Sequence, residues 1–474
     1  MKKRIFSIAI LLAVFQVSKA QTNNFYPNDI TDALHAYSGN FNTSGTARSI
    51  GMGGAMGALG GDISAVEINP AGLGIFRSST ANITLNILGN KNQASMENSY
   101  SNTNTNFNLT NAGVVLAFGN EGDPWKVNFG MNYKYQTLDD DVIFPSNQNI
   151  YTSDEGGNQY GFTQWEQHTS GYKLQSGLTI AGNYKDTWYF GAGLNFHYAN
   201  FDRSSIYYDK NITSGKNEIT RYYEDLTPYS QDADGMSFSV GVIGKITPEF
   251  RVGAAYNSPI WWTDIDTDYT SYAADDRGVS YDYYYFDGFK NTAPGNIVLS
   301  AAYASDISSD GKQSLAANFD FVNYFNKNYD FRGSDMEYRT NNYFVDNYMQ
   351  DSQEYRIGVE YRYDILRLRA GYGYASSPVK NKSIYGSLNP TDNFNSQVKN
   401  YLAGERNSFG AGIGGDWGGF FADFAYQWIQ QKYYTSFSGD FYSYVPASFD
   451  NSTPYFGKVK NTQNNFVLTL GYRF

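Results

Sequence analysis

The sequence of 474 residues contains no cysteine and only three histidines. The absence of cysteine excludes a disulfide framework, a thiolate metal site, a cysteine nucleophile and a lipid attached to cysteine. His35, His168 and His197 lie far apart, and none stands in a metal-ligand spacing such as H-E-x-x-H. We therefore expect no metal site, no cofactor and no catalytic residue. A Ser/His hydrolase remains a weak alternative, in which His197 lacks an evident serine partner.

Long hydrophobic runs are missing beyond residue 20, and none reaches the roughly 18 to 20 residues of a membrane helix. The first twenty residues, MKKRIFSIAILLAVFQVSKA, combine a basic start, an apolar centre and small residues, which predicts a signal peptide over 1–20. Because this segment holds four of the 35 Lys and Arg residues and no acid, its removal would shift the formal charge from -11 to -15. So acidic a chain would repel nucleic acid, and no nucleic-acid partner is expected.

Aromatic residues and glycine are abundant instead, with 43 Tyr, 33 Phe and 47 Gly. Mean hydropathy is nevertheless only -0.50, so the aromatics are dispersed among polar residues, as alternating strands require. In the last segment Phe466, Leu468 and Leu470 share one face, while Val467 and Thr469 share the other. From residue 79 onward such segments recur between polar turns, which indicates an all-β protein.

The alternating segments predict fourteen strands, near 79–90, 107–119, 124–137, 171–184, 187–201, 235–247, 249–261, 292–304, 312–326, 352–363, 364–377, 405–417, 418–432 and 462–474. Short turns and polar stretches of roughly fifteen to thirty-five residues alternate between them, the pattern of an outer-membrane barrel with short periplasmic turns. We therefore predict a 14-stranded antiparallel transmembrane β-barrel over 79–474, located in the bacterial outer membrane, in contact with its lipid and monomeric.

Charged residues on the strands indicate which face looks inward. An arginine facing lipid would cost about 2 to 4 kcal/mol at the bilayer midplane. The charged side chains should therefore point into the lumen, where they either form a structural ladder of ion pairs or line a permeation path. These candidate lumen charges are Arg356, Glu360, Arg362, Arg367, Arg369 and Asp423.

The segment before the first strand, residues 21–78, contains the glycine run GMGGAMGALGGD at 51–62. The run lacks the Gly-Lys-Ser/Thr end of a phosphate-binding loop, and Met56 replaces the third glycine of a dinucleotide fingerprint. A barrel of fourteen strands is wide enough to leave a void unless something fills it. We therefore expect residues 21–78 to fold inside the barrel as a hatch, with glycines allowing close backbone packing.

The stretch TARSIGMGGAMGALGGDISAVEINPAGLGIF resembles the hatch of the FadL-type outer-membrane transporters of hydrophobic compounds, and suggests a Bacteroidetes-like member. The similarity continues in ITPEFRVGAAYNSPIWW, APGNIVLSAAYA, EYRIGVEYRYDILRLRAGYGYASSPV and the terminal FVLTLGYRF. The resemblance implies a barrel blocked by its hatch that passively takes up hydrophobic small molecules such as long-chain fatty acids. It further implies a ligand site beside the hatch and release through a conformational change and a lateral opening.

The resemblance and the residue types nominate a ligand-binding and hatch site. Asn69, Pro70 and Ala71 match the Asn-Pro-Ala of the family and suit a rigid bend, or else an ordinary turn. The flexible apolar residues Met52, Met56, Leu59 and Phe76 either touch a hydrophobic ligand or pack against the wall.

The long outer stretches leave a second function open. The stretch 263–289 is rich in Tyr and Asp, and no amphipathic helix is indicated in any outer loop. The alternative to transport is a barrel that docks a protein partner through these loops in protein secretion or surface attachment. The acidic run Asp139, Asp140 and Asp141 is either solvated loop charge or a divalent-cation site.

Overall fold

The computed structural model describes residues 27–474 except 121, 148–150, 154–156, 214–218, 224–226, 276–277, 334–336, 385–395 and 437–455. The predicted signal peptide and residues 21–26 lie outside this range. Within it, no helix has the length and apolar character needed to cross a membrane.

Twenty of the described strands form one antiparallel sheet, which closes because β1 pairs with both β2 and β22. Several strands continue one another along the wall, so the barrel has fourteen positions, as predicted. In chain order these are β1 (Thr80–Ser95), β2 (Ser99–Phe118), β3 with β4 and β5 (Trp125–Thr137, Asp140–Pro145, Tyr151–Ser153), β6 (Gln159–Tyr184), β7 (Trp188–Asn211), β8 with β9 (Ile219–Tyr223, Tyr229–Lys245), β10 with β11 (Phe250–Asn257, Ile260–Asp275), β12 with β13 (Gly278–Ala293, Asn296–Asp306), β14 with β15 (Gln313–Tyr324, Asp330–Arg332), β16 (Ser352–Tyr363), β17 (Leu366–Ala375), β20 (Arg406–Asp416), β21 (Phe420–Ser436) and β22 (Phe456–Arg473).

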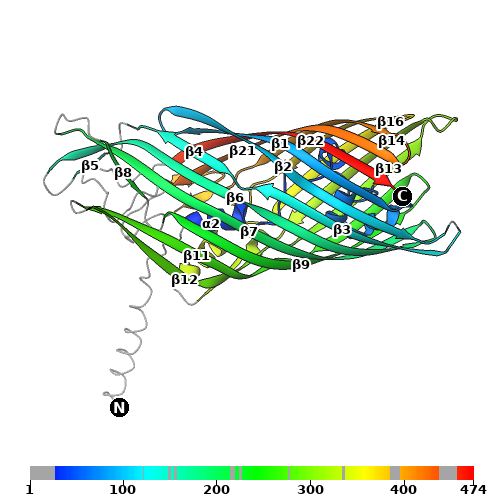
Figure 1. The fold of residues 1–474 in the computed structure, drawn as a ribbon, viewed down its shortest axis with the longest axis horizontal. Coiled ribbons are helices and arrows are strands. Elements are labelled where there is room, and N and C mark those ends of the chain that lie inside the picture. The colour runs from blue at the N-terminus through cyan, green and yellow to red at the C-terminus, as the bar shows by residue number, and fades with distance from the viewer. Residues whose placement is uncertain are drawn as a thin grey trace, which may run out of the picture.

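The two faces of the wall differ as the alternation requires. On β22, Phe466, Leu468 and Leu470 are exposed on the outside, whereas Val467 and Thr469 are buried inside. Short turns such as Asp364-Ile365 between β16 and β17 lie at one end of the barrel, and the long hairpins lie at the other (Figure 1). By the general rule for outer-membrane barrels, the short turns face the periplasm.

The strands extend well beyond the predicted ends toward the long-hairpin side, which corrects the expectation of long irregular loops. The stretch 91–106, for example, is a continuous hairpin of β1 and β2, and β6 alone has 26 residues. A membrane strand needs only about 9 to 11 residues, so these strands rise far out of the bilayer. Outside the bilayer neither face of a strand has to be apolar. The polar residues 102–106 therefore show no alternation from which a strand could be predicted.

Helices complete the structure at three places. The outer connection between β15 and β16 holds α4 (Glu337–Tyr348), a helix that sequence analysis did not indicate. A short hairpin of β18 (Lys382–Ile384) and β19 (Ser396–Val398) lies in the outer connection between β17 and β20, and the turn η4 (Asn326–Asn328) lies between β14 and β15. Residues 27–76, here called the inner segment, form α2 (Pro27–His35), α3 (Ala47–Gly51), η2 (Ile63–Glu67) and η3 (Pro70–Ile75). These elements lie inside the barrel, drawn in blue behind the front strands (Figure 1).

Candidate functional site

Glycine allows the inner segment and the wall to meet backbone to backbone. A Cβ atom on Gly371 of β17 would lie 2.1 Å from the carbonyl carbon of Met52. Gly53 has a φ of +66°, a conformation that residues with side chains rarely adopt, and its Cβ would meet the wall at Tyr372 N, 2.8 Å away. On the opposite wall, a Cβ on Gly191 would lie 2.3 Å from the carbonyl carbon of Pro70. The glycine run thus serves close packing.

The triplet Asn69, Pro70 and Ala71 begins η3. The Asn69 Oδ1 atom accepts a hydrogen bond of 3.1 Å from the Ala71 amide, and Pro70 is the first residue of the turn. The Asn69 Nδ2 atom donates to the carbonyl of Val242 on β9 at 3.2 Å. One side chain therefore both caps the turn and attaches it to the wall.

A carboxylate of the wall holds the glycine run, and sequence analysis did not nominate it. The Met56 and Gly57 amides donate to Asp320 of β14 at 3.0 and 3.2 Å, and the Ala58 amide donates to Asn318 at 3.1 Å. Asp320 is fully buried. An inward-facing aspartate on an otherwise uncharged strand was the available signal.

The apolar candidates of the glycine run pack tightly. Met52 and Met56 are fully buried and Leu59 nearly so, in a cluster with Ala58, Ala65 and Ala302. Leu59 and Phe76 also line a cavity at the short-turn end. Of the four residues, only these two face open space in this conformation.

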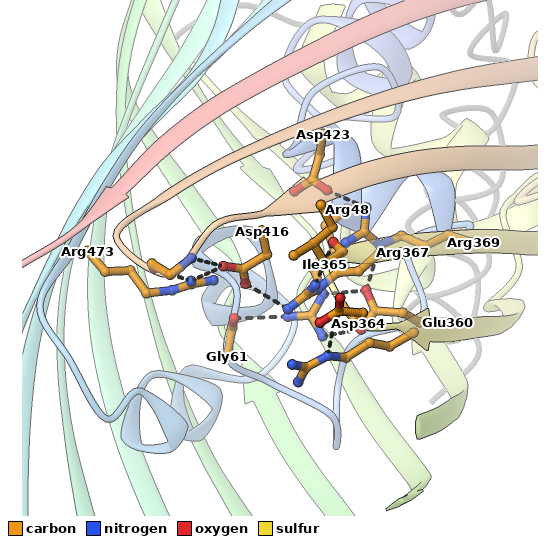
Figure 2. A network of polar contacts seen from close by, with 12 residues as sticks. Arg48, Gly61, Glu360, Asp364, Ile365, Arg367, Arg369, Asp416, Asp423 and Arg473 are labelled. Atoms are coloured by element: carbon orange, nitrogen blue, oxygen red, sulfur yellow. Dashed lines mark hydrogen bonds and ion pairs between the residues drawn. The ribbon is translucent and has the colours of Figure 1, made fainter. Parts of the chain in front are cut away.

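The lumen charges form ion pairs that join the wall to the inner segment. Arg48 of α3, which sequence analysis did not nominate, binds both oxygens of Glu360 at 3.0 Å. Arg369 bridges Glu360 at 2.5 Å and Asp423 at 2.6 Å, and Figure 2 shows these four side chains converging from α3, β16, β17 and β21. Removing one partner of such a buried pair generally costs about 3 to 5 kcal/mol, because a charge is left uncompensated.

The remaining candidate charges lie nearby or in a second network. Arg367 and Arg473 both bind Asp416, at 2.7 and 2.8 Å (Figure 2). Arg356 and Arg406 both bind Glu354, at 2.7 and 2.9 Å. Arg362 is exposed at the short-turn end and donates to the Asp364 carbonyl.

Two cavities lie on opposite sides of the inner segment and share no lining residue. The outer cavity, of about 160 Å³, is lined largely by polar side chains such as Asn90, Gln136 and Gln463. It adjoins an apolar cluster of α2, α4 and the wall, which includes Ile30, Trp262 and Phe344. The periplasmic cavity, of about 550 Å³, lies at the short-turn end and is rich in arginine.

The other polar candidates are occupied by neighbours. Asp140 lies in β4 and accepts hydrogen bonds from Asn90 and Asn92 at 2.8 and 2.5 Å, so this part of the acidic run is bound to the wall and is not loop charge. The His197 Nε2 atom lies 2.8 Å from the Ser237 hydroxyl, a serine that sequence analysis could not single out. Both residues are buried and line neither of these cavities.

A family model described as outer membrane protein transport protein (OMPP1/FadL/TodX) matches residues 31–394. The chain belongs to this family. The family is one of outer-membrane transport proteins and not of enzymes, which confirms the predicted family, its location in the outer membrane and the absence of enzyme activity. The suggested Bacteroidetes-like origin stays a prediction. No curated protein matches the sequence.

Solved structures share the fold of this family member at low sequence identity. A FadL homologue from Pseudomonas aeruginosa has a TM-score of 0.55 and 13% identity, over 91% of this chain and 98% of that chain. The toluene transporter TodX from Pseudomonas putida has a TM-score of 0.54 and 15% identity, over 92% and 99%. The toluene transporter TbuX from Ralstonia pickettii has a TM-score of 0.51 and 14% identity, over 92% and 99%.

Proposed function

We propose that this chain passively takes up hydrophobic small molecules that carry a polar group, such as long-chain fatty acids, and that the inner segment acts as its hatch. The observation that carries the proposal is the position of the inner segment between two cavities that lie toward opposite ends of the barrel. Movement of this segment would join the two cavities into a route across the membrane. In this reading 1–20 is the signal peptide, 21–78 the hatch and 79–474 the barrel.

The surroundings of the outer cavity support an amphipathic cargo. Ala36, Phe201 and Leu402 belong both to its lining and to the apolar cluster, so a polar and an apolar surface meet there. A molecule with a hydrocarbon chain and a polar head could contact both at once. The similar structures TodX and TbuX are described as toluene transporters, and toluene is hydrophobic, which also supports a hydrophobic cargo.

A reversible lock tests whether the hatch must move. A Cβ atom on Gly74 of η3 would lie 3.6 Å from the Cβ atom of Ala181 on β6, within the range of a disulfide. Because the chain has no cysteine, the double variant Gly74→Cys/Ala181→Cys would contain only this pair. In cells lacking their own transporter, we expect oxidation to reduce uptake of radiolabelled oleate at least about tenfold and a reductant to restore it.

The single variants Gly74→Cys and Ala181→Cys, treated in the same way, are the controls. Uptake by the oxidised double variant at the level of these controls would contradict movement of η3. Cells that take up no oleate with the natural chain, together with a stoichiometric protein partner in a pulldown of the barrel, would favour the docking function instead.

A further inference from the structure

Arginine is concentrated in the periplasmic cavity although the chain as a whole is acidic, with a formal charge of -11. The lining holds seven arginines and five acids: Arg48, Arg77, Arg251, Arg362, Arg367, Arg369, Arg473, Asp62, Asp306, Glu360, Asp416 and Asp423. Positive charge that is gathered in a cavity with low-dielectric walls raises the local concentration of anions.

Four of the seven arginines are held in ion pairs within the protein. Arg48, Arg367, Arg369 and Arg473 bind Glu360, Asp416 and Asp423, which leaves those three acids fully engaged. Asp62 accepts from the Thr46 hydroxyl and the Ser64 amide, and Asp306 is exposed. Among the described residues, no carboxylate lies within ion-pair distance of Arg77, Arg251 or Arg362.

Arg251 on β10 shows most directly that a partner is lacking. Its Nη1 atom donates to the Leu59 carbonyl at 3.0 Å, but its Nε atom is buried and has no acceptor among the described residues. The charge of Arg77, which has no ion-pair partner among the described residues, also repels the charge of Arg251. A buried donor without an acceptor is costly, as is the repulsion between two like charges, and an anion bound between Arg77 and Arg251 would offset that repulsion.

The structural contacts of these arginines leave donors free. A guanidinium has five N–H donors. Arg251 uses one of them on Leu59 and Arg362 uses one on Asp364, and both residues line the cavity. Guanidinium groups match carboxylate and phosphate oxygens in geometry and charge.

We propose that the periplasmic cavity is an anion-binding site in which Arg77, Arg251 and Arg362 hold a carboxylate or phosphate group. The inference deepens the proposed function, on which its choice of ligand rests: the anion is the head group of an amphipathic cargo that has passed the hatch. A free phosphate group has the same chemistry and is tested as the second source.

A binding experiment on the full chain in a nonionic detergent tests the site. The probes are a fluorescently labelled dodecanoate, the dodecanol with the same label, and inorganic phosphate as competitor. The variant Arg77→Gln/Arg251→Gln removes two charges from the lining, and Lys312→Gln removes one exposed charge from a short turn outside the cavity. We expect dodecanoate to bind about tenfold more weakly to the double variant, with dodecanol binding unchanged and Lys312→Gln like the natural chain.

Unchanged dodecanoate affinity in the double variant would overturn the proposal, as would an equal loss of dodecanol. Displacement of dodecanoate by phosphate would support the anion site and add free phosphate as a ligand, whereas charge-dependent binding without displacement would support the cargo head group. Folding is checked by the difference in gel mobility between unheated and heated samples of the barrel. If the double variant does not fold, the single variant Arg362→Gln, at an exposed position of the same cavity, replaces it in the binding experiment. Transport is measured separately as oleate uptake, so its failure would leave a charge-dependent binding result standing.

Discussion

Single glycines set how closely the inner segment approaches the wall. Gly371 of β17 faces the backbone of Met52. On the opposite wall, Gly191 of β7 faces the backbone of Pro70. At both positions two backbones occupy the space in which a side chain would begin. Residue type at these sites is therefore dictated by contact across the lumen and not by strand propensity, in which glycine is unfavourable.

We predict that Gly371→Ala destabilises the folded protein by about 1 to 3 kcal/mol, the usual cost of overpacking. The new methyl group would lie 2.1 Å from the Met52 carbonyl carbon, and backbone on both sides must shift. Urea unfolding of the barrel in detergent measures the change. Gly89→Ala is the matched control, because its nearest neighbour is the Asn464 carbonyl oxygen at 3.8 Å. Equal stability of the two variants would contradict the packing argument.

His35 at the end of α2 makes the outer part of the inner segment sensitive to pH. The pKa of His35 is lowered from 6.5 to about 4, first by burial and then by the nearby charges of Arg203 and Lys173. The released segment therefore binds a proton more readily than the docked one. The stabilisation of the docked segment by neutral His35 is fully present above about pH 6.5 and is lost as the pH falls toward 4.

Between pH 7 and pH 5 we expect docking of α2 to weaken by about 1 to 2 kcal/mol. Hydrogen exchange of the amides in 27–35 measures this loss. Asp32 opposes the effect, because burial raises the pKa of its carboxyl and protonation then favours the docked state. The variant His35→Gln isolates the histidine contribution and should show no increase in exchange. Increased exchange of equal size in His35→Gln would contradict the role of His35.

At the scale of elements, lipid contact decided what could be predicted from sequence. Where β16 and β22 cross the bilayer, the outer face must be apolar, and the alternation locates both strands. The outer halves of β1 and β2 carry no such pattern, so the sequence indicated a loop where the structure has a hairpin. The helix α4 was missed for a related reason: Phe344 and Tyr348 pack onto α2 and the wall, a tertiary contact that local sequence does not reveal.

The inner segment is the element whose removal should alter permeability most. We predict that deletion of 21–76 produces a barrel that conducts ions in planar bilayers, because fourteen strands leave an open lumen when nothing fills it. The wall strands pair with one another independently of this segment, so the barrel should still form. Conductance as low as that of the natural chain, from a barrel with normal strand content, would show that the segment does not block the lumen.

At the scale of the whole molecule, the candidate site depends on contacts between distant parts of the chain. Arg48 meets Glu360 across 312 residues, and Met56 meets Asp320 across 264. The inward direction of the wall charges could be predicted from the cost of placing them in lipid. The partner Arg48 could not, because it lies outside the strands and alternation says nothing about it. That Arg251 has no ion-pair partner among the described residues could not be predicted either, because it depends on which acids the neighbouring arginines bind in the fold.

The orientation of the barrel decides which solution each cavity meets, and it can be measured directly. The chain lacks cysteine, so a single introduced thiol reports one position. Glu97 is exposed at the tip of the β1–β2 hairpin, and Ser309 is exposed in the short turn between β13 and β14. Because short turns of outer-membrane barrels face the periplasm, we expect Glu97→Cys to react in intact cells with a maleimide too large to cross the outer membrane.

Ser309→Cys should react with the same reagent only after the outer membrane is permeabilised. The opposite labelling pattern would mean that the short turns face the medium and the long hairpins face the periplasm. The arginine-rich cavity would then meet the medium, and its anion site would capture ligand from outside instead of receiving a head group from the hatch. Equal labelling of both variants in intact cells would contradict a barrel that spans the outer membrane, since one of the two ends must be shielded. The direction of labelling thus determines whether Arg77 and Arg251 stand at the exit or the entrance of the route.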